Sequence, residues 1–273
     1  MKIVGLPERA GGVPPSGLPC YKRAMGKEKR RLDESLVAIG LAADTSEATG
    51  LILAGKVVVD DQRVDKPGTM IGLDQVVRLK GKQAPFVSRA GEKLAGALDD
   101  FGLTESIPGM QVIDVGSSTG GFTDCLLKAG AAHVFSVDVV TNQLDFRLRR
   151  DERVTVMERL DIRSLDIETI PALDLVVADI SFNSLVRLSD ALWRLPAQGE
   201  LIFVLLVKPQ FELAGSEIDK GGLVTDPALQ QKAVDLVRKR FTELGATNFA
   251  EMKSGVLGRT GNQEFFLKFA RQS

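Results

Sequence analysis

A glycine-rich turn between a strand pattern and a helix pattern constrains the fold of this chain more than any other feature. The apolar stretch 111–115 runs into GSSTGG, where Gly116, Gly120 and Gly121 stand among hydroxyl side chains, and FTDCLLKAGA follows. Glycines let the backbone approach a ligand closely, and the start of a helix offers unpaired N–H groups to an acceptor. A strand, a bare turn and a helix in this order predict a nucleotide-binding unit.

The chain around this turn alternates strand and helix patterns. Strands are expected at 111–115, 133–138, 154–158, 174–178 and 200–207. Helices are expected from the cap residue Ser88 to about Asp100 and at 120–129, 142–150, 184–194 and 226–243. Two last strands, 247–253 and 263–269, have no helix between them. This order predicts an α/β fold, with a Rossmann-like class I methyltransferase sheet that ends in an antiparallel C-terminal hairpin.

The spacing of the turn and the acidic residues around it indicate the ligand. Gly116 is followed by three residues and then by two glycines, which departs from the dinucleotide fingerprint G-x-G-x-x-G. Asp138 ends the next strand, where a carboxylate can accept ribose hydroxyls, and a sulfonium zwitterion suits carboxylates better than a pyrophosphate does. We expect S-adenosylmethionine, bound by Asp114, Gly116, Ser117, Ser118, Gly120, Gly121, Phe122, Asp138, Asp161 and Asp179. Asp161 is the residue expected at the adenine amino group.

Composition argues against several other classes of protein. His133 is the only histidine, and Cys20 and Cys125 are the only cysteines, so we expect no Ser-His-Asp site, no disulfide framework and no metal. The longest apolar run, LIFVLLV, is far shorter than the roughly 18 residues that a membrane-spanning helix needs. The N-terminus has no apolar core of a signal peptide. We therefore expect a cytoplasmic protein without membrane contact.

The N-terminal part has a different pattern. Segment 22–31, KRAMGKEKRR, has six basic side chains and one acidic, a density that suits a phosphate backbone, whereas 4–19 is rich in Gly and Pro and expected to be flexible. Met25 begins the basic segment MGKEKRRLD and would be a natural N-terminus, so residues 1–24 are expected to be dispensable. Helices are expected at 31–40 and from 45 to 55, the second capped by Thr45 or Ser46. A strand, turn and strand follow from 56 to 68, and a last strand at 75–79.

This block resembles the small RNA-binding domain of ribosomal protein S4. The similarity lies in Arg31-Leu32-Asp33, Leu51-Ile52, Ala54-Gly55-Lys56-Val57 and Val64-Asp65-Lys66-Pro67-Gly68. It implies a small α+β RNA-binding domain at 31–82, after a flexible basic arm at 1–30 and before a linker at 83–88. The RNA contacts are expected at Lys29, Arg30, Arg31, Lys56, Arg63 and Lys66. The alternative is a small docking domain that binds no nucleic acid.

The segments SRAGEKL, DVGSSTGGFTDCLL, VDVVTNQL, ADISFNSL, LVKPQFE, KGGLVTDP and GNQEFF resemble the TlyA family. Its members carry the names hemolysin A and ribosomal RNA 2′-O-methyltransferase, and their catalytic domain, here 89–273, is FtsJ-like. The resemblance implies S-adenosylmethionine as cofactor, ribosomal RNA or a ribosomal subunit as partner, and a catalytic tetrad of Lys93, Asp179, Lys208 and Glu264. The alternatives are a catalytically silent RNA-binding protein, a membrane-active hemolysin and a nicotinamide enzyme.

The position of the tetrad in the pattern fits this chemistry. Lys208 follows LIFVLLV and Asp179 follows the strand before it, at the carboxyl ends where α/β sheets place their active sites. A desolvated lysine beside a second lysine can have a lowered pKa and accept or share the proton of a 2′-hydroxyl. Asp179 is expected to orient Lys208, and Lys93 and Glu264 to fix the hydroxyl and the first lysine. Loop 209–226 is expected to be a lid over RNA.

Overall fold

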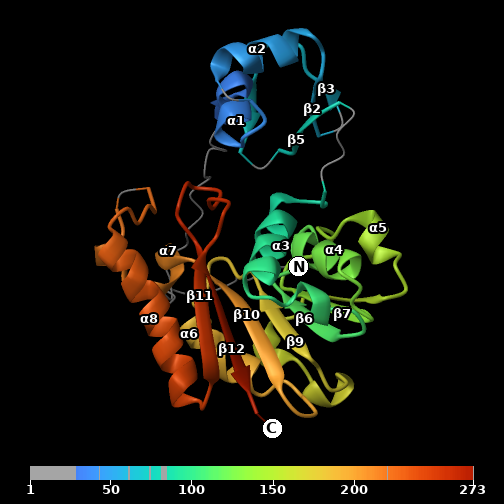
Figure 1. Cartoon of the computed structure of the whole chain (residues 1–273), viewed down its shortest axis with the longest axis vertical. Coiled ribbons are helices and arrows are strands. Elements are labelled where there is room, and N and C mark those ends of the chain that lie inside the picture. Colours follow the sequence, from blue (N-terminus) through green and yellow to red (C-terminus); the bar gives the residue numbers. More distant parts are fainter. Residues whose placement is uncertain are drawn as a thin grey trace, which may run out of the picture.

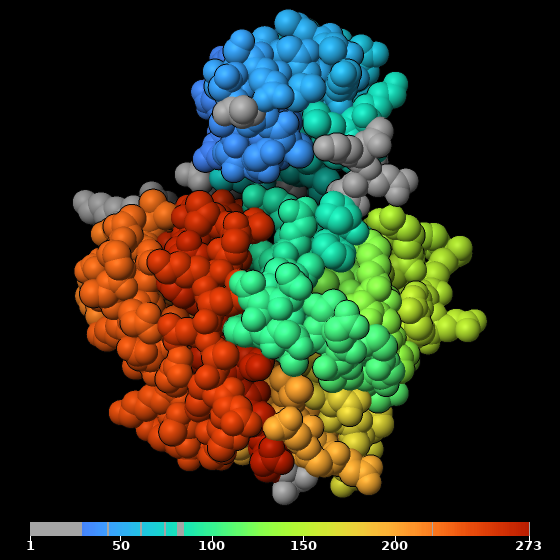
Figure 2. Space-filling model, viewed as in Figure 1, coloured from blue at the N-terminus to red at the C-terminus, as the bar shows by residue number. Residues whose placement is uncertain are grey.

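The computed structural model describes residues 29–42, 44–60, 62–73, 75–80, 85–219 and 221–272. The stretch 4–19, most of the basic arm and Cys20 lie outside the described residues. Figure 1 shows a small unit built from the N-terminal elements and a larger unit built around the main sheet. In the space-filling view the small unit forms a lobe of its own on top of the larger one (Figure 2).

The small unit is an α+β domain with two helices and two short sheets. Its helices are α1 (Leu32–Ala38) and α2 (Thr45–Leu53). One sheet pairs β1 (Lys29–Arg31) with β4 (Met70–Gly72), and the other has the order β3 (Gln62–Arg63), β2 (Val57–Val59), β5 (Val77–Leu79). Apolar side chains from both helices and both sheets form one buried cluster, which includes Leu36, Ile52, Val57 and Ile71. This core explains why the pattern of short helices and strands folds as a unit.

One local prediction for this domain was wrong, and two strands were missed. Helix α2 is capped by Asp44 and not by Thr45 or Ser46: Asp44 has an extended backbone, and its carboxylate accepts from the backbone N–H of Glu47 at 2.8 Å. A residue can cap only while its own backbone is outside the helix, and Thr45 is already the first helical residue. Strands β1 and β4 were not predicted, because they pair with each other across about forty residues of sequence, as the Arg30 to Ile71 register shows. Lys29 and Arg30, predicted as the end of the flexible arm at 1–30, therefore belong to the folded domain.

The larger unit contains the predicted mixed sheet, with seven strands in the order β11-β12-β10-β9-β6-β7-β8. The parallel strands are β6 (Gln111–Val115), β7 (His133–Asp138), β8 (Val154–Glu158), β9 (Leu175–Ala178) and β10 (Leu201–Val207). The hairpin of β11 (Thr247–Lys253) and β12 (Phe265–Arg271) adds to one edge, with β12 antiparallel to β10. In Figure 1, β12 runs away from the small domain toward the C-terminus. Because β12 is antiparallel to β10, the carboxyl ends of β10 and of the other parallel strands face the small domain.

Helices cover both faces of the sheet. On one face α3 (Arg89–Asp100), α4 (Gly121–Lys128) and α5 (Phe146–Arg149) pack into one buried cluster. On the other, α6 (Leu185–Trp193) and α8 (Pro227–Glu243) pack into the second. The connections add α7 (Pro209–Glu212) and four short 3-10 turns, η1 (Thr104–Ser106), η2 (Ile162–Ser164), η3 (Ile167–Thr169) and η4 (Gly215–Glu217). No helix within the described ranges is long and apolar enough to cross a membrane.

Two predicted elements of this domain differ from the structure. Helix 142–150 was predicted too long: Asn142 has a left-handed backbone (φ 58°), its N–H donates to Glu158, and α5 begins only at Phe146. Ser88 stands before α3 as expected, but its hydroxyl makes no capping bond to the helix. The only histidine, His133, hydrogen-bonds the hydroxyl of Thr155 on the neighbouring strand at 2.8 Å.

Candidate active site

The glycine turn after β6 requires its glycines for conformation and for space. Gly116 has φ +85°, and a Cβ on it would lie 2.7 Å from the carbonyl oxygen of Asp179. Gly120 has φ +92°, and a Cβ there would collide with the side chains of Leu144 and Leu148. Both backbone conformations are rare for residues with a Cβ. The turn therefore contacts the segment that follows β9, and this segment carries the predicted catalytic Asp179.

Asp138 at the end of β7 holds two loops together. One carboxylate oxygen accepts from the N–H of Ser118 at 2.7 Å, and the other accepts from the N–H of Val140 at 2.8 Å. Ser118 has a left-handed backbone (φ 48°), and its hydroxyl lies 3.0 Å from Gln143. Asp138 thereby fixes the glycine turn relative to the segment after β7, and each carboxylate oxygen keeps a lone pair for a further donor.

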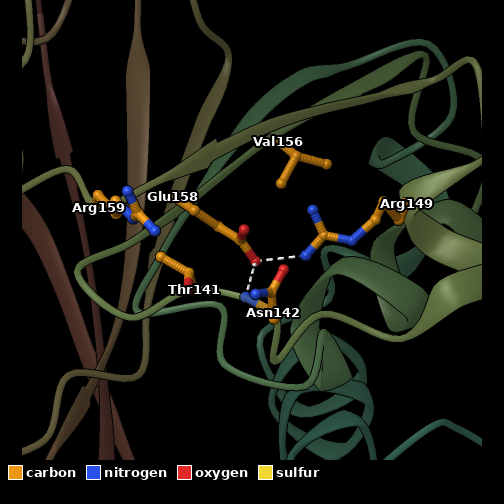
Figure 3. Close-up of a pocket in the computed structure, with 6 residues that line it drawn as sticks. All are labelled: Thr141, Asn142, Arg149, Val156, Glu158 and Arg159. Atoms are coloured by element: carbon orange, nitrogen blue, oxygen red, sulfur yellow. Dashed lines mark hydrogen bonds and ion pairs between the residues drawn. The ribbon is translucent and has the colours of Figure 1, made fainter.

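Next to Asp138, a hollow of about 370 Å³ opens beside α5 (Figure 3). It is lined by Thr141, Asn142, Arg149, Val156, Glu158 and Arg159. Figure 3 shows Glu158 pointing to its middle, where it accepts from the N–H of Asn142 at 2.9 Å and pairs with Arg149. The bond with Arg149 lowers the pKa of Glu158. Glu158 is paired in register with Asp138, and these two acidic residues hold the segment after β7 at Val140 and Asn142.

Asp161, predicted at the adenine amino group, is hydrogen-bonded to Arg163 of its own segment. One of its oxygens accepts from the backbone N–H and Nε of Arg163, and the other accepts from Nη2 at 2.6 Å. These hydrogen bonds lower the pKa of Asp161. The carboxylate is thus anionic and oriented by a neighbour two residues away, and a ligand amino group there has to share it with Arg163.

Asp114 is the most buried carboxyl of the region, with no exposed surface. Its Oδ2 accepts from the hydroxyl of Thr123 at 2.7 Å, and that hydroxyl lies 3.3 Å from Ser136. Burial, together with the negative charges of Asp179 and Asp138, raises the pKa of Asp114 to about 7. Strand register explains this grouping, because Asp114, Ser136 and Val156 are directly paired across β6, β7 and β8.

Two buried polar atoms at the start of α4 fit an amino-acid ligand. Asp114 Oδ1 and Ser88 Oγ have no hydrogen-bond partner in the part of the chain that the structure describes. Ser88 Oγ lies against the position that a Cβ on Gly121 would take. Buried polar atoms are rarely left unpaired, and a carboxyl oxygen and a hydroxyl can serve an amino group and a carboxylate. The residues present therefore fit the methionine part of S-adenosylmethionine, and Ser88 is a candidate that sequence reasoning assigned only to capping.

Phe122 was predicted among the cofactor residues, and the structure shows which of its atoms are available. Its side chain is 2% exposed and packs in the core, with its ring 6.1 Å from that of Phe266. Only its backbone, in the first turn of α4, remains for a ligand. Ser117 is buried too, and its N–H donates to the carbonyl of Val137 at 3.2 Å.

The predicted tetrad forms two largely buried ion pairs, whose side chains are between 4% and 19% exposed. Lys208 Nζ lies 2.6 Å from Asp179 Oδ1 and donates to the hydroxyl of Ser181 at 2.8 Å. Lys93 Nζ, on α3, donates to Glu264 at 2.6 Å. Both lysine side chains are 10% exposed, so each ammonium depends on its carboxylate. The two pairs are neighbours, because the antiparallel register of β10 and β12 pairs Val207 with Phe265, and Lys208 and Glu264 directly adjoin these two residues.

Three residues near Lys208 were not singled out from the sequence. Besides Ser181, Phe182 is 84% exposed with a left-handed backbone (φ 65°), and its ring lies 5.5 Å from that of Phe211. Glu212 accepts from the hydroxyl of Ser184 at 2.5 Å and from a backbone N–H at the start of α6, and burial raises its pKa. Their only sequence signal was their place within ADISFNSL and LVKPQFE.

The loop predicted as a lid is partly ordered and anchored. It contains α7 and η4, and the buried Asn262 accepts from the N–H of Val224 and donates to the carbonyl of Gly222, both at 2.8 Å. Asn262 lies two residues before Glu264, so the loop is tied to the segment that carries one of the ion pairs. Its movement over RNA stays a prediction.

The basic residues of the small domain are exposed but differently oriented. Lys29 and Arg31 lie on one face of β1 and Arg30 on the other, because side chains alternate along a strand. Arg31 is already paired with Asp33 at 2.6 Å. The other three predicted contacts, Lys56, Arg63 and Lys66, are exposed.

Comparison with known proteins finds different family models for the small and for the larger domain. The model of the S4 domain matches residues 30–77, and the model of the FtsJ-like methyltransferase matches residues 86–271. The chain is 40% identical over 247 residues to the 16S/23S rRNA (cytidine-2′-O)-methyltransferase TlyA of Mycobacterium tuberculosis, covering 90% of this chain and 91% of that protein. It is 34% identical to Hemolysin A of Brachyspira hyodysenteriae, over 88% and 99% of the two chains. The solved structure of a hemolysin-named protein from Streptococcus thermophilus superposes with a TM-score of 0.73 at 35% identity, over 91% and 90%.

Proposed function

The chain belongs to the TlyA family of S-adenosylmethionine-dependent ribosomal RNA 2′-O-methyltransferases, and we propose that its two buried lysine–carboxylate pairs carry out the methyl transfer. The substrate is a ribose 2′-hydroxyl of ribosomal RNA, and the relatives' names point to a cytidine. Because ribosomes are cytoplasmic, the protein acts in the cytoplasm, on ribosomal RNA or on a ribosomal subunit.

One observation supports this proposal above the others: the glycine turn and Lys208 meet at Asp179. The backbone carbonyl of Asp179 faces Gly116, and its side chain lies 2.6 Å from Lys208 Nζ. A single residue thus connects the turn that binds the cofactor with the lysine that meets the substrate. S-adenosylmethionine, when bound, supplies the electrophilic methyl group on its sulfonium.

The protein side of the reaction follows from these contacts. Lys208 binds the 2′-hydroxyl, and in its neutral amine form it takes up the hydroxyl proton on the lone pair of Nζ and becomes an ammonium as the oxygen becomes a nucleophile. Asp179 holds the lysine in place, and its negative charge faces the side on which the cofactor binds. Lys93, fixed by Glu264, provides a second positive group beside the hydroxyl. The transfer then depends on positioning and on fixed charges.

We assign the cofactor to the carboxyl ends of β6 and β7. Asp138 receives the ribose hydroxyls, and Asp114 Oδ1 with Ser88 Oγ receives the methionine part. Phe182, which follows Ser181 and is exposed, offers a flat apolar surface to an unstacked base, and proteins commonly hold single-stranded RNA by such stacking. The small domain, 31–82, binds the RNA through its exposed basic side chains and delivers a loop or junction nucleotide to domain 89–273.

The experiment that tests the function is methylation of ribosomal subunits from cells that lack this protein, with mapping of the 2′-O-methyl site. Lys208→Ala should lower the rate by roughly 10² to 10⁴-fold, the usual contribution of a positioned acid or base. Its affinity for S-adenosylmethionine should hardly change, because Asp138 and the glycine turn are untouched. A Lys208→Ala enzyme that methylates near the wild-type rate would remove the lysine from the mechanism.

Deleting residues 1–85 tests the role of the small domain. The remaining chain should bind S-adenosylmethionine with similar affinity but need a much higher RNA concentration, and the difference should shrink as salt is raised. Equal RNA affinity with and without these residues contradicts the assignment of RNA binding to the small domain.

A further inference from the structure

The amine of Lys208 is held by two side chains in different ways. Asp179 Oδ1, at 2.6 Å, is its ion-pair partner, but this contact lacks hydrogen-bond geometry. Ser181 Oγ, at 2.8 Å, accepts a directed hydrogen bond from Nζ. Asp179 therefore supplies the opposite charge, and Ser181 supplies the direction. With Asp179 alone, the nitrogen would keep the freedom to rotate about the ion pair, because lysine has a flexible stem and rotatable donors.

We propose that Ser181 is a positioning residue for the methyl transfer, whose hydrogen bond orients Lys208 Nζ toward the ribose 2′-hydroxyl. This rests on the proposed function of Lys208. Ser181 acts through the lysine and does not itself exchange the proton. A hydroxyl suits this task, since it accepts a hydrogen bond from Nζ without bringing a second negative charge, which would favour the protonated amine and oppose uptake of a proton.

The surroundings of Ser181 hold its hydroxyl in a fixed place. The neighbouring Ile180 is buried. Ser184, three residues after Ser181, donates its hydroxyl to Glu212, which also accepts from the N–H of Leu185. Glu212 belongs to α7, which begins directly after Lys208. The segment that carries Ser181 is thus tied to the segment that carries the lysine at a second point. Two such ties between the same segments keep the Ser181 to Lys208 distance constant.

Among the residues that the structure describes, no other acceptor near Lys208 replaces Ser181. Within these ranges the polar contacts of Nζ are to Asp179 and Ser181, and the ring centre of Phe211 lies 6.0 Å away. Glu264 adjoins Phe265, the register partner of Val207, but it is bonded to Lys93. Removal of the Ser181 hydroxyl therefore frees one direction of the amine.

The test uses the full chain with three substitutions at one position. Ser181→Ala removes the hydroxyl, Ser181→Cys keeps the size but offers only a weak acceptor, and Ser181→Thr keeps the hydroxyl. Under single turnover with saturating S-adenosylmethionine and unmethylated ribosomal subunits, the Ala and Cys variants should be slower by about 10 to 10²-fold, the effect of a misplaced reacting group. The Thr variant should retain most of the rate. The affinities for cofactor and for RNA should stay at the wild-type values.

A double-mutant cycle separates this role from a structural one. In the Lys208→Ala background, Ser181→Ala should cause no further loss of rate, because a positioning residue has nothing left to position. Ser106→Ala, which removes an exposed hydroxyl on η1 ahead of β6, serves as the control and should have the full rate.

Each outcome decides something. A fully active Ser181→Ala enzyme beside an inactive Lys208→Ala enzyme overturns the role of Ser181 and leaves the proposed function intact. A fully active Lys208→Ala enzyme overturns both. Loss of cofactor affinity in Ser181→Ala, or an added loss of rate in the Lys208→Ala background, shows that Ser181 supports the structure of the site and contradicts positioning.

Discussion

Asp114 is expected to make the stability of the methyltransferase domain fall as the pH rises. This carboxyl is completely buried, and burial together with two neighbouring carboxylates raises its pKa from 3.8 to about 7. The folded protein therefore binds this proton more tightly than the unfolded chain does. The resulting stabilisation is fully present below pH 3.8 and is lost as the pH rises through 7.

The size of the effect follows from the two pKa values. One pKa unit corresponds to about 1.36 kcal/mol, so the whole change amounts to about 4 kcal/mol. Between pH 5 and pH 8, a range in which the protein can be handled, roughly 3 kcal/mol of it is expected. Asp114→Asn removes the titrating group but keeps an oxygen for the Thr123 hydroxyl. The free energy of unfolding of this variant should lack this part of the pH dependence.

Trp193 provides the assay. It is the only tryptophan of the chain, and it stacks on Phe203 at 5.8 Å inside the larger domain, so its fluorescence reports unfolding of that domain. Denaturant unfolding at pH 5 and pH 8 gives the difference between wild type and Asp114→Asn at each pH, in which the contributions of other groups cancel. Asp100→Asn, at an exposed position at the end of α3, is the matched control and should follow the wild type. An equal difference between wild type and Asp114→Asn at both pH values would refute the reasoning.

Three other substitutions test the site. Glu264→Gln leaves the buried Lys93 without its carboxylate and should cost about 3 to 5 kcal/mol of unfolding free energy, most of which returns when Lys93→Met is added, while methyl transfer stays lost. Gly116→Ala should reduce S-adenosylmethionine affinity in calorimetry, because its Cβ would lie 2.7 Å from a carbonyl oxygen, whereas Gly109→Ala, with a similar φ of +87° and open space, should not. Asp138→Ala should weaken cofactor binding by a few kcal/mol at most, as expected for lost charge-assisted hydrogen bonds, and equal binding of NAD would contradict the cofactor assignment.

The sequence by itself determined the order and kind of the main elements. Apolar runs such as LIFVLLV, helical spacing of apolar residues and the glycines of the turn depend on neighbours within a few positions, where backbone preferences act. The same order shows that the residues after the parallel strands meet at one edge, which is why Asp138, Asp179 and Lys208 were expected near one another. Capping at residue 44 and the short α5 were missed, since single hydrogen bonds decide such boundaries.

Only the tertiary structure decided which charges pair and which stay without a partner. Lys93 and Glu264 are 171 residues apart, and they meet because β12 inserts beside β10 and places Glu264 at the carboxyl edge of the sheet. Packing across elements likewise leaves one oxygen of Asp114 unpaired and brings the hydroxyl of Ser181 within hydrogen-bond distance of Lys208. Burial and hydrogen bonding depend on what a side chain meets in space, and that is set by strand order and register, which no stretch of neighbouring residues contains.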